Sequence, residues 1–181
     1  GEGYCARLGV REERCKAVGI VNIVVVAPGS IFLGGMLEPV KSAKDPMKKL
    51  DQGIPFKKRP SALRFDYKTI RKHKLYKATG GTRITELEGT DNAEVTMYLI
   101  HRWEDADGNI YAKRIGTVHE KYGTDVPNWV NGHTLEVHYG DITKESFFKP
   151  YMGLLPADKT YYTKNSKGKM VPVQEVGWGT P

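Results

Sequence analysis

The chain has 181 residues, of which 39% are hydrophobic and 27% charged, and its net charge is +7. This length and apolar content can bury a core without structural metals or many disulfides, which excludes a disordered or low-complexity chain. The longest apolar stretch, residues 20–27, is far shorter than the roughly 20 residues that a membrane helix needs, so no membrane span is predicted.

Strand signals dominate the N-terminal third. Residues 4–8 are predicted as a first strand. Residues 20–26, rich in β-branched side chains and stopped by Pro28-Gly29, are predicted as a second strand that is buried on both faces. Residues 30–33 are expected to resume the sheet, and residues 46–51 are the best candidate for a short helix.

The middle of the chain has the clearest alternation. Leu63, Phe65 and Tyr67 alternate with polar residues, which predicts a strand with one buried face. Residues 94–103 and 109–119 flank an Asp-Ala-Asp-Gly turn at 105–108, which predicts an antiparallel hairpin.

The last third is predicted to hold less regular structure. Residues 133–139 are predicted as a further strand that opens after a turn at Asn131-Gly132. The Pro- and Gly-rich remainder is expected to form loops with short strands at most.

Fold class follows from this pattern of short strands and turns without βα alternation. The sequence has no internal repeat and no dividing linker, so residues 1–181 are predicted to form one all-β domain. The expected architecture is an antiparallel, jelly-roll-like β-sandwich.

Two basic clusters bring nucleic acid into consideration as a partner. They are Lys57-Lys58-Arg59 and Arg71-Lys72-His73-Lys74. Neither lies on a predicted recognition helix or in an RNA-binding motif, and turns with solvated lysines explain both, so no nucleic-acid partner is predicted.

Cys5 and Cys15 are the only cysteines. Two cysteines in isolation cannot build a four-ligand zinc site. A disulfide between them and a pair of free thiols both stay open, because the separation of their Cα atoms decides between them.

Three blocks of the sequence resemble a known family. They are residues 3–8 (GYxARL), 29–34 (GSIFLG) and 54–68 (IPFKKRPSALRFDYK). In this order they resemble the PCMD family, a carbohydrate-metabolism domain of Bacteroides-type cell-envelope proteins. The third block is the most specific, because it is similar to that family's Pro-Phe-x-x-Arg-Pro followed by a strand ending in Tyr-Lys. The likeness runs to about Tyr139.

This resemblance implies a sandwich similar to carbohydrate-binding modules, exported to the periplasm or the outer-membrane surface, with a poly- or oligosaccharide as its partner. The family pattern continues beyond Pro181 with further strands. We therefore expect the chain to be a piece of a longer protein, with a second chain or the remainder of the same protein completing the sandwich.

Exposed aromatic rings are the sugar-binding groups that the sequence offers, because the C–H face of a pyranose packs on a ring. Trp129 is the best candidate, since it lies between Asn128 and Asn131 in a Pro-containing segment predicted to be a loop. Trp178, in a Gly-rich terminal segment, is the second. The other aromatics, most of which are expected to pack in the core, are Trp103, Tyr151, Tyr161 and Tyr162.

Catalytic residues are not assigned. A glycosidase needs two carboxylates roughly 5 to 10 Å apart. Asp66, Glu136 and Asp141 lie on or beside predicted strands, but each is more simply a solvent-facing strand residue or a turn former.

No metal or cofactor is predicted. Asp105 and Asp107 begin a segment similar to a calcium loop, which keeps calcium as an alternative. The loop lacks a glutamate at its twelfth position, and the hairpin turn already explains it. A metal site through His133 and His138 is a further alternative; the remaining histidines are His73, His101 and His119.

The leading hypothesis is a non-catalytic, glycan-associated domain of the cell envelope. A glycoside hydrolase is the alternative, and a structural or adhesin-type surface domain is a third possibility. A cleft with two facing carboxylates would favour hydrolysis, and a shallow aromatic platform would favour binding.

Overall fold

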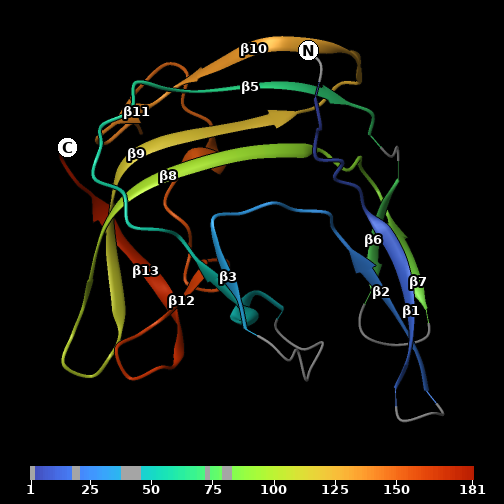
Figure 1. The fold of residues 1–181 in the computed structure, drawn as a ribbon, viewed down its shortest axis with the longest axis horizontal. Coiled ribbons are helices and arrows are strands. Elements are labelled where there is room, and N and C mark those ends of the chain that lie inside the picture. Colours follow the sequence, from blue (N-terminus) through green and yellow to red (C-terminus); the bar gives the residue numbers. More distant parts are fainter. Residues whose placement is uncertain (1–2, 18–20, 38–45, 72–73, 79–82) are drawn as a thin grey trace. The chain divides into compact units, whose positions relative to one another are not determined.

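Strands make up almost all of the regular structure in the computed structural model, which describes residues 3–17, 21–37, 46–71, 74–78 and 83–181. In that part of the chain the helical elements are two single 3-10 turns, η1 (Pro46–Lys49) and η2 (Pro150–Met152). The predicted all-β class is confirmed. The contacts divide the chain into two units, residues 1–32 with 71–91 and residues 33–70 with 92–181, and Figure 1 shows their strands. The prediction of one domain over residues 1–181 stays a prediction.

The first unit is built from two antiparallel pairs. β1 (Arg11–Ala17) pairs with β2 (Val21–Ala27), and β6 (Leu75–Ala78) pairs with β7 (Ile84–Leu87). The second predicted strand is thus present as β2, with Val24 buried, and Ile20 lies outside the described residues. The predicted strand at residues 4–8 is wrong. That segment is irregular and exposed, and β2 pairs with the polar segment from Arg11 onward instead.

The second unit contains a seven-stranded sheet and a separate two-stranded ribbon. The sheet has the order β11-β9-β13-β12-β4-β3, with β8 also on β9, and the ribbon pairs β5 with β10. The β13–β9 and β12–β4 pairs are parallel, and the others are antiparallel. The bounds of these strands are β3 Gly34–Met36, β4 Leu50–Gln52, β5 Ala62–Thr69, β8 Ala93–Glu104, β9 Ile110–Tyr122, β10 Val126–Glu136, β11 His138–Tyr139, β12 Tyr162–Lys164 and β13 Met170–Trp178.

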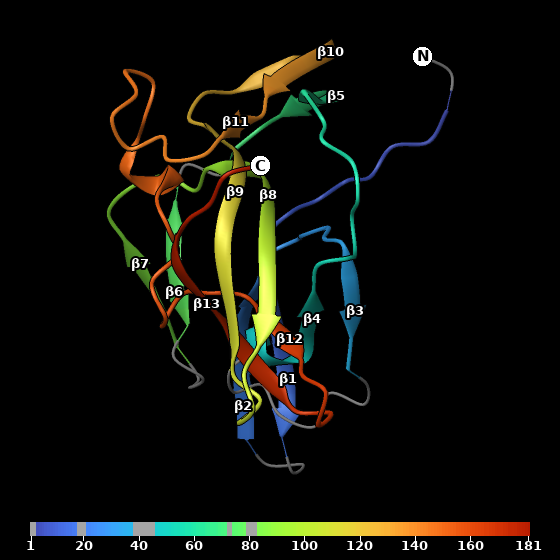
Figure 2. The ribbon, with the colours of Figure 1, turned by 90° about the vertical axis from the view of Figure 1, so that its left-hand side faces the viewer.

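The ribbon and the sheet form two layers (Figures 1 and 2). Aromatic rings lie between these layers. Tyr67 of β5 lies 4.6 Å from Tyr122 of β9 and 5.1 Å from His133 of β10, measured between ring centroids. In β5 the residues Leu63, Phe65 and Tyr67 are half-buried and their polar neighbours are exposed, as the alternation predicts. This layering gives the sandwich-like arrangement that the strand pattern indicates.

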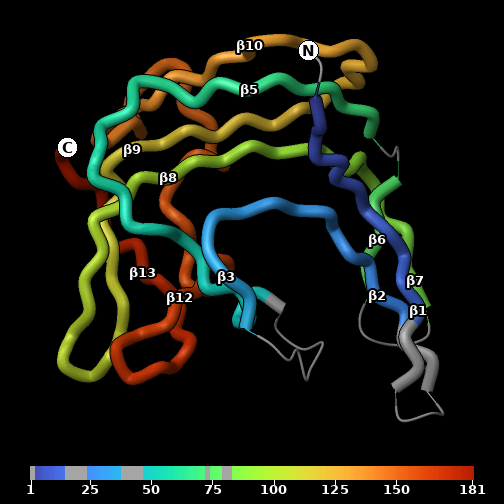
Figure 3. Tube along the Cα trace, in the orientation of Figure 1, coloured from blue at the N-terminus to red at the C-terminus, as the bar shows by residue number. Residues whose placement is uncertain are grey.

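The predicted hairpin is confirmed by β8 and β9, which pair over their whole length from Glu104 opposite Ile110. The turn between them is held by Asp105, whose carboxylate accepts the backbone N–H groups of Asp107 at 3.0 Å and Asn109 at 2.8 Å. The trace in Figure 3 shows this hairpin as the longest in the described part of the chain.

Three other predictions are corrected. Residues 30–33 are irregular, and the sheet resumes only at β3. The helix predicted at 46–51 is the single turn η1, followed at once by β4. The C-terminal part contains β13, a nine-residue strand, because the edge of β9 offers a partner that buries Val173 against Ile110 and Ala112.

A buried ion pair links β9 to β13. The Arg114 and Glu175 side chains are both 0% exposed and meet in a two-point contact, with Nε donating to Oε1 at 2.6 Å and Nη2 donating to Oε2. Arg114 also donates to the Thr117 hydroxyl at 3.4 Å, and its guanidinium lies 3.6 Å from the Tyr98 ring centroid. The Leu155 N–H donates to Glu175 Oε2 at 2.7 Å. Each charge is therefore compensated by several partners.

Replacing one member of this pair is expected to cost more stability than replacing both. Arg114→Met leaves the Glu175 carboxylate buried without its partner, which costs about 3–5 kcal/mol. The double variant Arg114→Met/Glu175→Leu removes both charges and should recover a large part of that loss. Urea denaturation measures both values. A double variant no more stable than Arg114→Met would contradict this account.

Candidate functional site

Trp129 lies within strand β10, so the loop predicted around it is wrong. The Asn131-Gly132 turn predicted before the next strand is likewise part of β10, as a bulge. Val130 pairs with Tyr67 and His133 with Phe65, so between these two pairs β10 advances three residues while β5 advances two. One residue of β10 is therefore extra, which defines a β-bulge.

The bulge decides which way Trp129 faces. Side chains alternate between the two faces of a strand, so a one-residue insertion exchanges the faces for everything beyond it. His133 and Leu135 are half-buried on one side of the bulge, and Val130 is half-buried on the other. Without the extra residue, Trp129 would share the inner face with His133. With it, Trp129 points outward and is 47% exposed.

Gly132 allows this bulge to form. Its φ is +66°, a conformation that side chains rarely adopt, and its N–H donates to Asp66 Oδ1 at 2.5 Å. A Cβ atom on Gly132 would stand 2.6 Å from Nη2 of Arg64. Glycine is therefore favoured at position 132 for two reasons: it adopts the positive φ without strain, and it leaves room for the Arg64 side chain across the ribbon.

The outer face of the ribbon around Trp129 carries charged and amide groups. Lys68 Nζ lies 5.4 Å from the centroid of the Trp129 ring. Asn131, two residues after Trp129 in β10, is exposed, and so is Asn128, the residue before Trp129. Arg64, Asp66 and Lys68 all lie on the exposed face of β5. This surface, which we name the Trp129 face, lies where β10 is irregular, because the register against β5 shifts both between Val126 and Val130 and between Val130 and His133.

Trp178 has a different environment from the one predicted. It is the last residue of β13 rather than part of a loop, it is half-buried, and the Arg114 guanidinium lies 5.8 Å from its ring centroid. Its ring therefore belongs to the surroundings of the buried ion pair.

The other aromatic candidates divide between core and surface. Tyr161 packs against the Ile110–Val173 core, and Tyr162 is half-buried in β12. Trp103 is 39% exposed and stacks on Tyr111 with ring centroids 6.0 Å apart. Tyr151 lines a cavity described below.

Asp66 and Glu136, the two candidate carboxylates on the ribbon, do not form a facing pair. Asp66 accepts the Gly132 N–H, and Asp141 accepts the Thr143 N–H at 3.0 Å and its hydroxyl at 2.7 Å. Glu136 pairs with Ala62, four residues from Asp66 along β5. At about 3.3 Å per residue this places the two roughly 13 Å apart along the ribbon, beyond the spacing that glycosidases use.

The candidate metal ligands Asp105, His133 and His138 contact other protein groups. Besides the turn contacts, Asp105 Oδ2 accepts from the Asn109 side chain at 2.9 Å, and these bonds, the side-chain one foremost, lower the Asp105 pKa. His133 Nε2 lies 2.7 Å from Glu120 Oε2, and His138 stacks on Phe147 with centroids 4.0 Å apart. No group of three metal-ligating side chains occurs among the described residues, and His73 lies outside them. Calcium stays an untested alternative.

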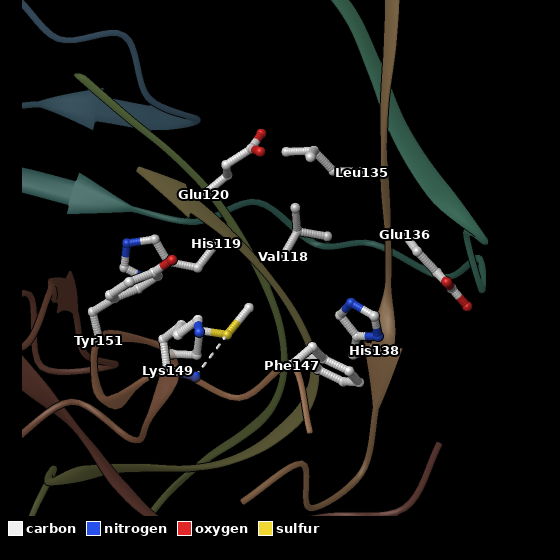
Figure 4. A pocket seen from close by; sticks show the side chains of 10 residues that line it. Val118, His119, Glu120, Leu135, Glu136, His138, Phe147, Lys149 and Tyr151 are labelled. Atoms are coloured by element: carbon white, nitrogen blue, oxygen red, sulfur yellow. Dashed lines mark hydrogen bonds between the residues drawn. The ribbon is translucent and has the colours of Figure 1, made fainter. Parts of the chain in front are cut away.

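A cavity that the sequence does not reveal opens beside β9. β11 pairs with β9 only at Gly116 and Thr117, while β10 pairs with β5, so the chain from β10 to β11 separates from β9 and leaves a fork. The space in this fork is about 210 Å³. Figure 4 shows its lining, which consists of Val118, His119, Glu120, Leu135, Glu136, His138, Phe147, Lys149, Tyr151 and Met152.

His119, which lines the cavity, also belongs to a polar network with Tyr98 and Glu94. His119 Nδ1 lies 2.8 Å from the Tyr98 hydroxyl, and Nε2 lies 3.2 Å from Glu94 Oε2. Burial is the largest influence on His119 and lowers its pKa. Burial would raise the pKa of Glu94, but the hydrogen bonds from Lys121, 2.7 Å away, and from His119 outweigh it and lower that pKa.

The described members of the basic clusters and Cys5 have ordinary surroundings. Lys57, Lys58 and Arg59 are exposed, with the Arg59 guanidinium 4.6 Å from the Tyr139 ring centroid. Lys74 forms an exposed ion pair with Glu86, and Lys72 and His73 lie outside the described residues. Cys5 is exposed and free. In the described part of the chain, no helix has the length and apolar character needed to cross a membrane.

Comparisons with known proteins give no relatives. No family model matches the chain, and neither a curated protein nor a solved structure is significantly similar to it.

Gly132→Ala should destabilise the protein by about 1–2 kcal/mol, because alanine pays a steric cost at positive φ. The matched control is Gly123→Ala, since a Cβ at Gly123 meets no atom within 4 Å. Urea denaturation compares the two. Equal losses for both variants would show that the Gly132 conformation is not required.

His119 should make the protein less stable in mild acid. A lowered pKa in the folded state means that the unfolded chain binds the proton more tightly. The contribution of neutral His119 to stability is therefore complete above the ordinary histidine pKa of about 6.5. It is lost as the pH falls through the lower folded value. His119→Gln should flatten the decline in unfolding free energy between about pH 7.5 and 5.5. His101→Gln, at an exposed position, is the control and should leave the slope unchanged. Identical slopes for all three proteins would exclude His119 as the cause.

Proposed function

We propose that the chain is a non-catalytic carbohydrate-binding domain that binds glycans on the Trp129 face. The observation that carries this proposal is the exposed Trp129 ring, held outward by the β10 bulge beside Lys68, Asn128 and Asn131. The C–H groups of a pyranose pack on such a ring, while amide and ammonium groups bond to the hydroxyls at its edge. The platform combines both kinds of contact.

The backbone around Trp129 supports binding in a second way. The ring precedes Val130, which pairs with Tyr67 of β5, and the Gly132–Asp66 hydrogen bond joins the two strands just beyond it. A surface that is already ordered loses little conformational entropy when it binds, so a small contact area is sufficient for useful affinity.

Binding is favoured over hydrolysis by the placement of the carboxylates. Asp66 and Glu136 are too far apart along the ribbon for a glycosidase pair, and Asp141 is a local turn cap. The Trp129 face is also shallow, whereas hydrolysis requires acid and base on opposite sides of one bond.

The cellular setting in this proposal rests on the sequence resemblance. Residues 54–68, which carry the most specific likeness to the PCMD family, include the part of β5 that bears Arg64, Asp66 and Lys68. We infer that the protein is exported and acts in the periplasm or on the outer-membrane surface, where poly- or oligosaccharides are available.

Trp129→Ala should abolish retention of the protein on those glycans of an array that bind the wild type. Its midpoint of thermal unfolding should change little, because Trp129 is 47% exposed and lies outside the buried core. Trp103→Ala is the matched control, since Trp103 is comparably exposed on a different strand, β8. Retention that survives Trp129→Ala, or that Trp103→Ala removes equally, would refute the assignment. Release of sugar from any bound glycan would favour a glycoside hydrolase instead.

A further inference from the structure

The cavity in the fork between β9 and β10 is separate from the Trp129 face. Leu135 lines the cavity from the inner face of β10, whereas Trp129 points outward beyond the bulge. Its volume of about 210 Å³ is below the range of roughly 300–1,000 Å³ that is typical for drug-sized ligands. The cavity is therefore suited to a ligand of one ring rather than to a chain.

Apolar and aromatic groups form most of the cavity wall. Val118, Leu135 and Met152 contribute aliphatic surface. Two ring pairs also contribute: His138 stacked on Phe147 at 4.0 Å, and His119 against Tyr151 at 4.7 Å between centroids. Figure 4 shows the two pairs on opposite sides of Val118. A pyranose ring, whose C–H groups form an apolar face, fits such a wall better than a flexible polar chain does.

The polar side chains that line this cavity differ in whether they can still bond to a ligand. Glu120 Oε2 lies 2.7 Å from His133 Nε2, and a carboxylate has enough lone pairs to accept a further hydroxyl group. The Glu136 carboxylate points outward in Figure 4, away from Glu120. Lys149 makes no ion pair, and His138 makes no side-chain hydrogen bond, in the described part of the chain. The unused groups are thus a cation and an imidazole, with one acceptor opposite.

We propose that this cavity binds a single acidic sugar residue, a uronic acid. Its carboxylate would bond to Lys149 and His138, its C–H face would pack on Val118 and Leu135, and a hydroxyl would donate to Glu120. The ligand class rests on the proposed carbohydrate function, but the cavity and its residues do not overlap with the Trp129 face.

Two-dimensional NMR of the isotope-labelled full chain tests this proposal, with sodium glucuronate, glucose and sodium acetate as probes. Glucuronate should shift the resonances of Val118 and Leu135 in a saturable way. Lys149→Met should weaken this binding about ten-fold or more, as loss of a charge-assisted hydrogen bond does. His138→Gln should weaken it as well. Lys144→Met, an exposed lysine of the same segment that does not line the cavity, should not.

Three outcomes would overturn the proposal: no shift at cavity residues with glucuronate, equal binding of glucose or acetate, or equal affinity in Lys149→Met. The two proposals can fail separately. Trp129→Ala should leave the glucuronate shifts intact, and Lys149→Met should leave retention on neutral array glycans intact. A Trp129 variant with normal glycan retention therefore counts against the Trp129 face alone, and absent glucuronate shifts count against the cavity alone.

Discussion

The buried contact between Arg114 and Glu175 is the interaction on which the larger unit depends. Moving two charges out of water is expensive, and the cost is met only when the geometry is good and the remaining donors and acceptors are satisfied. Here the ion pair is bidentate. The guanidinium also donates to the Thr117 hydroxyl and lies over the Tyr98 ring, and the Leu155 N–H donates to the carboxylate. These requirements fix β13 beside β9 in one register. A shift of β13 by one residue would bring Val176 or Gln174 to Arg114 in place of Glu175.

With that register fixed, β9 becomes the strand that the rest of the unit is organised around. Its two faces have different roles because side chains alternate along it. Thr117 and His119 face the polar network with Tyr98, whereas Val118 and Glu120 face the β5–β10 ribbon. The cavity arises where β11 stops pairing with β9 and β10 joins β5. It is therefore a consequence of one chain segment serving two sheets.

Local patterns in the sequence are sufficient for the elements whose partners are close in the chain. The alternation in β5 and the Asp105–Asn109 turn of the β8–β9 hairpin are both visible in a few residues. The sequence does not predict β13, because its partner, β9, is about sixty residues away and contributes the burial of Val173. The cavity escapes prediction for the same reason, since no short segment encodes the divergence of two strands.

The Asn131-Gly132 pair shows how a correct local signal can lead to a wrong structure. Its composition favours a turn, and Gly132 does adopt a positive φ. Because β5 supplies partners on both sides, the positive φ produces a bulge instead of a chain reversal. The sequence points to Trp129 because a loop is expected around it. In the structure Trp129 lies in a strand, and the exposure of its side chain comes from the reversal of faces at the bulge. The proposed sugar platform consequently lies on a strand whose register against β5 shifts on both sides of Val130.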